Sequence, residues 1–316
     1  MTSAAAPPQD SGRRSAVGVA LAVVAFLFLA PPLFLLAPLA ILLLFSRPAT
    51  IREWLWLVLA GAAAAKIVAD LDGASAPARL IGALGLIMTG AFVVLVHAAP
   101  RLSGFGRAAI AVGAGLVGVI VWGRAVGLEL SAIDSLVGAD LKRSLELLLE
   151  GAPADQVQSA LAAVPTVARA FPAIAALQAL LGLSLAWSWY SRLAVRPIGP
   201  APGPFAAFRF NDHLIWGAIF TLGLALVPAG DIFARVVTNA MVVWVGMYGA
   251  RGLAVAAHGA RKWPLPGRIL VVVMSFLAAP IAIGTLVTLG LADTWIDFRN
   301  RTVPAGGNNA DGSDSP

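Results

Sequence analysis

Apolar residues occur along this chain in long blocks that short polar segments separate. A bilayer core needs about 20 apolar residues for each helical crossing, and most of the blocks approach that length. The blocks lie at 16–46, 53–70, 80–97, 108–126, 169–190, 212–228, 233–256 and 268–292. The pattern predicts an all-α fold, a polytopic membrane helix bundle of about 8 transmembrane helices, within a range of about 7 to 9.

The first block, 16–46, differs from the others because prolines interrupt it at Pro31, Pro32 and Pro38. Proline removes a backbone donor and disrupts a helix, so the segment either crosses the membrane once or turns back as a short hairpin. Broken helices expose backbone groups, which are tolerated where they line a cavity or are covered by protein. The prolines therefore mark either part of a binding site or a tight hairpin.

Composition strengthens the membrane assignment and excludes several classes of protein. Hydrophobic residues make up 59% of the 316 residues and charged residues only 12%, against about 25% charged in a soluble domain. The chain has no cysteine, which excludes a disulfide-stapled module and a cysteine-ligated metal site. The net charge of +6 is scattered between the apolar blocks rather than gathered with aromatic residues. We therefore expect the lipid bilayer, and not nucleic acid, as its partner.

The distribution of charge between the blocks predicts an orientation. Alternate connections carry most of the basic residues, and by the positive-inside rule these face the cytoplasm. They hold Arg47, Arg52, Arg101, Arg107, Arg192, Arg196, Arg209, Arg261, Lys262 and Arg268. We expect a multi-pass protein of the bacterial cytoplasmic (inner) membrane. Strict alternation puts the C-terminus outside, which conflicts with Arg299 and Arg301, so its side stays open.

These features predict one membrane domain with two tails. We expect a cytoplasmic N-terminal tail at 1–15, a single transmembrane domain at 16–301 and a disordered C-terminal tail at 302–316. The domain includes an extramembrane segment, 128–168, in which apolar residues recur with helical spacing between charges. One pattern runs from Ile133 to Leu148 and a weaker one from Val157 to Val164, before Pro165, so this segment is predicted to form one or two amphipathic helices on the outer face of the bilayer. It serves either as a lid or docking element, or simply as a connector.

Two motifs resemble catalytic or nucleotide-binding sequences but lack the required context. Gly113, Gly115 and Gly118 match a G-x-G-x-x-G fingerprint, yet they lie inside an apolar helix, where glycines let helices approach closely. The run from Asp70 to Arg79 is a near match to the motif of membrane alcohol phosphatidyltransferases, but the further carboxylates that bind metal are missing. We predict no enzyme activity, no catalytic or metal-binding residues and no cofactor.

Charged residues inside the apolar blocks are the strongest indication of function. Arg251 lies well within a block, while Lys66 and Arg124 lie nearer block ends. Placing such a charge at the membrane centre costs about 3 kcal/mol on insertion scales, so it usually faces a cavity or a partner. We predict an anion-binding cavity in which Arg251 supplies charge and Asn239 a hydrogen bond. The alternative, strongest for Lys66 and Arg124, is that these side chains snorkel to the headgroups.

The C-terminal third of the chain resembles the YybS-like family of predicted bacterial membrane proteins, whose function is unknown. The resemblance rests on three stretches: Phe205 to Trp216, Asn239 to Val255, and Gly290 to Arg299. It is sharpest over residues 205–301. By distant similarity this family lies near the substrate-binding subunits of energy-coupling-factor vitamin transporters and near the shape protein MreD. The resemblance therefore implies a helical membrane core with a small-molecule pocket.

Three functional hypotheses follow from the sequence. The first is a transporter-subunit-like protein that binds a small, anionic ligand at Arg251, Asn239, Lys66 and Arg124, with a coupling subunit as its partner. The alternative is a non-transporting membrane scaffold for envelope machinery, which would belong to an envelope complex. A membrane-embedded lipid-modifying enzyme comes third.

Overall fold

The computed structural model describes residues 10–127 and 130–301, and all regular structure within these ranges is helical. The predicted all-α membrane helix bundle is thereby confirmed. Residues 1–9, part of the expected N-terminal tail, and the expected tail at 302–316 lie outside the described residues. The chain forms two compact units, one from residues up to 202 together with 225–243, the other from 203–224 together with residues from 244 onward.

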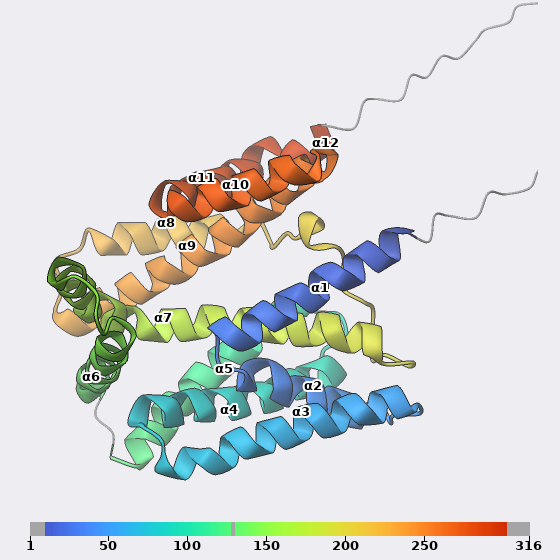
Figure 1. The fold of residues 1–316 in the computed structure, drawn as a ribbon, viewed down its shortest axis with the longest axis horizontal. Coiled ribbons are helices and arrows are strands. Elements are labelled where there is room, and N and C mark those ends of the chain that lie inside the picture. The colour runs from blue at the N-terminus through green and yellow to red at the C-terminus, as the bar shows by residue number, and fades with distance from the viewer. Residues whose placement is uncertain (1–9, 128–129, 302–316) are drawn as a thin grey trace, which may run out of the picture. The chain divides into compact units, whose positions relative to one another are not determined.

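The N-terminal unit contains seven complete α-helices within the described residues, together with the first half of α9 (Asp231–Gly259), which is described below (Figure 1). They are α1 (Asp10–Leu29), α2 (Leu33–Phe45), α3 (Ile51–Ala69), α4 (Ala76–Ala98), α5 (Gly104–Ala125), α6 (Leu130–Leu148) and α7 (Ala154–Leu193). The proline-broken block is thus two helices, α1 and α2, which meet at Pro31 and Pro32. The apolar part of each is shorter than a full crossing, as the hairpin alternative requires.

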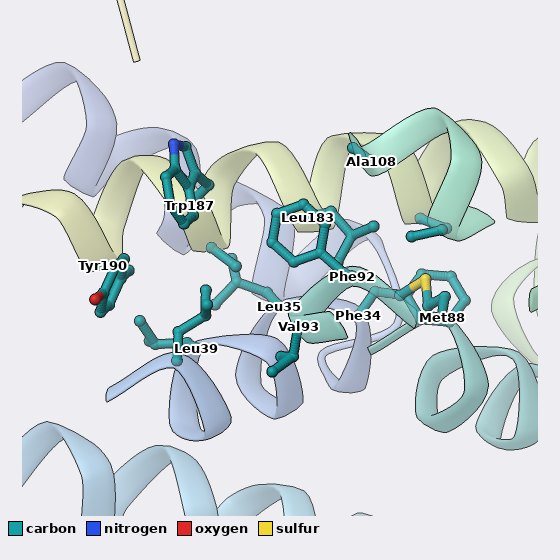
Figure 2. Packing of buried hydrophobic residues seen from close by; sticks show 14 of the residues in the cluster. Phe34, Leu35, Leu39, Met88, Phe92, Val93, Ala108, Leu183, Trp187 and Tyr190 are labelled. Atoms are coloured by element: carbon teal, nitrogen blue, oxygen red, sulfur yellow. The ribbon is translucent and has the colours of Figure 1, made fainter. Parts of the chain in front are cut away.

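Helix α2 lies at the centre of the N-terminal unit, packed against α3, α4 and α7. Its side chains Phe34, Leu35 and Leu39 are almost fully buried, and they meet Met88 and Phe92 of α4 in one apolar cluster (Figure 2). Small residues let the helices approach: a Cβ at Gly182 of α7 would lie 2.8 Å from the Cβ of Phe34. The core of this unit is therefore tightly interdigitated.

The glycine fingerprint in α5 is confirmed as a packing surface at two of its three positions. A Cβ at Gly115 would lie 3.0 Å from the Cβ of Met88, and a Cβ at Gly118 would lie 2.9 Å from Cγ2 of Ile87. Gly113 has open space around it. The glycines thus serve the contact between α4 and α5.

Helix α7 is much longer than a membrane crossing. Its 40 residues span about 60 Å, twice the roughly 30 Å of a bilayer core, so part of it must project from the bilayer. The weaker pattern at 157–164 and the block at 169–190 belong to one helix, because α7 continues through Pro165 and Pro172. Helix α6 packs along the first part of α7, where a Cβ at Gly138 would lie 3.8 Å from side-chain atoms of Val164 and Ala168. We call α6 and residues 154–168 of α7 the outer hairpin.

The C-terminal unit is built from shorter pieces. It contains the 3-10 turn η2 (Phe205–Ala207), α8 (Leu214–Ala225), the second half of α9 (Asp231–Gly259), η3 (Ala260–Lys262), α10 (Leu265–Leu277), α11 (Ala279–Ile296) and α12 (Phe298–Arg301). Helix α8 runs antiparallel to α9, because Thr221 contacts Trp244 while the earlier residue Asp212 contacts the later residue Arg251.

The block 268–292, expected as a single crossing, is divided at Ala278 into α10 and α11, which lie side by side (Figure 1). At the end of α11, Arg299 donates hydrogen bonds to the carbonyl oxygens of Ala206 and Phe208. The chain therefore enters α10 near the end of α9 and leaves α11 at that same end of the unit. Helices α10 and α11 form a hairpin that returns to the start of α8.

Six helices in the described ranges are long and apolar enough to cross a membrane. They belong to α3, α4, α5, α7, α9 and α11. The two remaining predicted blocks, 16–46 and 212–228, correspond to shorter apolar helices. The protein is thus a multi-pass membrane protein.

Candidate functional site

Arg251, the residue that the sequence singles out, is completely buried in the C-terminal unit and bound by two carboxylates. Its Nε lies 2.9 Å from Oδ2 of Asp293 on α11, and its Nη1 lies 2.6 Å from Oδ1 of Asp212, just before α8. Nη2 donates to the backbone carbonyl of Asp293 at 3.2 Å. The guanidinium also lies 5.4 Å from the ring centroid of Phe210, a cation–π contact.

A second arginine shares the buried carboxylate of Asp293. Arg299 Nη2 lies 2.6 Å from the same oxygen, Oδ2, that Arg251 contacts. We call Asp212, Arg251, Asp293 and Arg299 the C-terminal charge cluster. It contains two arginines and two aspartates, and an exposed pair, Arg209 with Asp297, lies beyond it at the end of α11. The cluster is electrically balanced, as buried charges must be.

Two glycines bring α9 and α11 close enough for this pairing. A Cβ at Gly252 would overlap the carbonyl oxygen of Leu286, and a Cβ at Gly290 would overlap the carbonyl oxygen of Tyr248. The backbones therefore touch immediately beside Arg251 and three residues before Asp293. This approach puts the guanidinium against the last turns of α11, where unpaired helix carbonyls also favour a cation.

The cluster region contains buried oxygen atoms that have no hydrogen-bond partner among the described residues. These oxygens include Oη of Tyr248 and Oδ1 of Asp293. Both lie next to the buried guanidinium, since Tyr248 is one helical turn before Arg251. Chemically, the cluster can fasten three segments of chain together, and it keeps unused acceptor capacity next to a buried cation.

Asn239 lies in the N-terminal unit, on the first half of α9, and its amide bridges the backbone of α7. Its Oδ1 accepts from the N–H of Ala173 at 2.9 Å, and its Nδ2 donates to the carbonyl of Arg169 at 2.9 Å. These are the two groups that an uninterrupted helix pairs directly. Pro172 disturbs the helical hydrogen bonding of α7 at this point, and the amide of Asn239 bonds the two backbone groups that are left without their usual partner.

Lys66 and Arg124 also belong to the N-terminal unit, and both are exposed. Lys66 pairs with Asp70 one turn later on α3, with side chains 74% and 61% exposed. Arg124 is at the end of α5. The structure therefore does not bring Asn239, Lys66 and Arg124 into contact with one another, and the binding of a ligand by any of the four residues stays a prediction.

The sequence reading missed the partners of Arg251. The carboxylate of Asp212 binds Arg251, while Asn211 accepts a hydrogen bond from the N–H of His213 at 3.0 Å. Asp293 lies within the stretch from Gly290 to Arg299 that carries the family resemblance. A single signal was available: an acidic residue near the end of a membrane helix needs a cation, and Arg251 was the buried cation in need of a carboxylate.

Comparison with known proteins gives one match. A family model described as a predicted membrane protein (DUF2232) matches residues 17–294. This match is consistent with the resemblance to YybS-like membrane proteins. Among curated proteins and solved structures, nothing matches the chain.

Proposed function

The chain belongs to the DUF2232 family of predicted membrane proteins, and from this premise we propose that it is a non-enzymatic scaffold of the bacterial inner membrane. In this proposal the outer hairpin docks a partner protein of the cell envelope. The observation that supports it best is the way in which the hairpin is fastened to the membrane helices. A simple connector needs no such attachment.

The attachment has three parts, all within the N-terminal unit. Asp134 of α6 pairs with Arg235 of α9 at 2.5 Å, with side chains only 27% and 23% exposed. Asp140 of α6 accepts a hydrogen bond from Ser75 at 3.3 Å, at the start of α4. Asn239 then holds α7 where it leaves the hairpin. The hairpin is thus held in a fixed orientation, which a docking platform requires.

The tip of the hairpin offers an apolar surface with acidic neighbours. Leu147 and Leu148 are 68% and 80% exposed, and Glu146, Glu150 and Asp155 lie close to them in the sequence. The apolar pair would form the centre of a small interface and the carboxylates its rim. The expected partner surface therefore combines apolar and basic residues.

Site-specific photocrosslinking in cells tests the scaffold. A photoreactive residue at Leu147 should give one discrete protein adduct. The same residue at Leu59, a 53% exposed leucine on α3, should give none. A second variant, Leu148→Asp, should abolish the adduct at position 147. Identical adducts at both positions, or no protein adduct at Leu147, would refute the proposal.

A second candidate function, transporter-subunit-like binding of a small anion, is favoured by the position of Asp212. The side chain of Asp212 is 57% exposed although its partner Arg251 is fully buried. An anionic ligand could therefore take the place of this carboxylate on Nη1 of Arg251. Thermal unfolding across vitamins and anionic metabolites tests it: a stabilising compound should bind Asp212→Asn more tightly and Arg251→Met not at all. Capture of a coupling ATPase at Leu147 would also favour this candidate over the scaffold.

A further inference from the structure

Arg107, in the first turn of α5, is a buried cation with no anionic partner among the residues that the structure describes. It is 4% exposed. Its side chain takes part in no ion pair or hydrogen bond within the described ranges, and its Nε is buried without a partner. Charged side chains are almost never buried to this extent unless they are paired.

The other buried charges show how complete such pairing is elsewhere in the described chain. Arg251 and Arg299 are bound by carboxylates. Glu53, 2% exposed, accepts hydrogen bonds from the backbone N–H groups of Ala49, Thr50 and Val195. Arg107 has only the indole ring of Trp187, 5.1 Å from its guanidinium carbon. A cation–π contact is weak compared with the cost of desolvating an ion, so Arg107 lacks its counter-charge.

The surroundings of Arg107 suit an anion. A cation in the first turn of a helix opposes the helix dipole, whereas an anion there is stabilised by the free end of the backbone. Ser103 caps α5 by accepting from the N–H of Gly106 at 3.0 Å, which fixes this turn. A Cβ at Gly104 would lie 3.9 Å from the ring of Trp187, so the start of α5 runs along the indole that also carries Arg107. Trp187 itself belongs to the apolar cluster beside Phe92 (Figure 2).

The level of this site in the membrane indicates which anion is available. Arg107 follows the polar turn at 99–103, which the charge distribution assigns to the cytoplasmic face, and tryptophans gather at the headgroup level of a bilayer. Phosphate groups are concentrated there, and the planar guanidinium fork matches the geometry of phosphate oxygens.

We propose that Arg107, the start of α5 and the ring of Trp187 form a binding site for a phosphate-bearing anion, supplied by an anionic lipid headgroup or by free phosphate. The bound anion supplies the negative charge that no described residue of the protein supplies to Arg107. This site is separate from the outer hairpin, and it does not depend on the scaffold proposal.

Thermal unfolding of the purified full chain in neutral detergent tests the site. One arm adds phosphatidylglycerol and compares it with phosphatidylcholine. The other adds inorganic phosphate and compares it with chloride at equal ionic strength. Stabilisation by phosphatidylglycerol alone identifies a lipid headgroup, and stabilisation by inorganic phosphate identifies the free anion; either outcome supports the site. No stabilisation by either would overturn it.

Three variants attach the effect to Arg107. Arg107→Met should lose the stabilisation, and Arg107→Lys, which keeps the charge but not the fork, should weaken binding about tenfold. Arg79→Met removes an exposed arginine from the first turn of α4 and should leave the stabilisation unchanged. Without added anion, Arg107→Met should unfold at the same or a higher temperature than the parent, because it removes an uncompensated buried charge. Equal loss in Arg79→Met would refute the assignment.

Discussion

The two compact units of this protein are held together by different interactions. In the N-terminal unit the large, fully buried side chains are almost all apolar, for example Phe34, Met88, Phe92 and Leu183. In the C-terminal unit the largest is Arg251, followed by Tyr248. Within lipid, apolar packing has no hydrophobic driving force and acts through close contact alone, whereas ion pairs strengthen as the dielectric constant falls. The C-terminal unit should therefore depend on a few charges, and the N-terminal unit on many small contacts.

The largest loss of stability in the C-terminal unit is expected from Asp293→Asn. This substitution removes the carboxylate that Arg251 and Arg299 share, and leaving a buried ion without its partner costs about 3–5 kcal/mol. We expect a loss of this size in the free energy of unfolding, measured by denaturant titration in mixed micelles. Asp297→Asn is the matched control, because its pair with Arg209 is exposed and is worth at most about 1 kcal/mol. Equal losses in the two variants would show that the charge cluster does not hold the unit together.

A smaller effect should appear where the N-terminal unit does rely on polar contacts. Asn239→Leu removes the hydrogen bonds of this amide to the N–H of Ala173 and the carbonyl of Arg169 in α7, and it leaves these backbone groups unsatisfied. We expect a loss of about 1–3 kcal/mol in the same titration. Thr238→Val is the control, because this neighbouring side chain is exposed and bonds only within its own helix. A similar loss in the free energy of unfolding for Thr238→Val would show that Asn239 has no special role in holding α7.

The smallest effect should follow Lys66→Gln. Its ion pair with Asp70 is exposed and lies within a single helix, so the expected loss is about 0.2–0.5 kcal/mol and should fade as salt is added. A salt titration of thermal unfolding measures it. A loss above about 1 kcal/mol would contradict the assignment of Lys66 to a solvated helix end.

Much of the fold was predictable because it depends on local sequence. Apolar blocks of sufficient length located the long helices, and Pro31 and Pro32 located the break between α1 and α2. The continuation of α7 through Pro165 and Pro172 was not predictable in this way. Proline is tolerated in a membrane helix when another group satisfies the freed backbone. Here that group is Asn239, which lies 66 residues from Ala173 in the sequence.

The candidate sites show the same limit. Hydrophobic patterning identified Arg251 as a charge in need of a partner, but Asp212 and Asp293 lie 39 and 42 residues away, and nothing local relates them. Arg107 was assigned to the cytoplasmic face as one of many loop charges. Its position was informative nevertheless, since a cation in the first turn of a helix opposes the dipole. Only the packing of Trp187 over it reveals that it is buried.

The hairpin of α10 and α11 indicates on which side of the membrane the described chain ends. Helix α8 leads away from the side of Arg209, and α9 leads back to it. Helices α10 and α11 then leave that side and return to it in the same way, whether they cross the whole bilayer or only enter it. The chain thus changes sides an even number of times after Arg209, and the last described residues share its compartment. Arg299 then obeys the same charge rule as Arg209. Because the chain has no cysteine, a single cysteine that replaces Arg209 can be labelled specifically. A membrane-impermeant thiol reagent should label this cysteine from one side of the membrane only. A protease added to that same side should cut a protease-sensitive tag fused to the C-terminus.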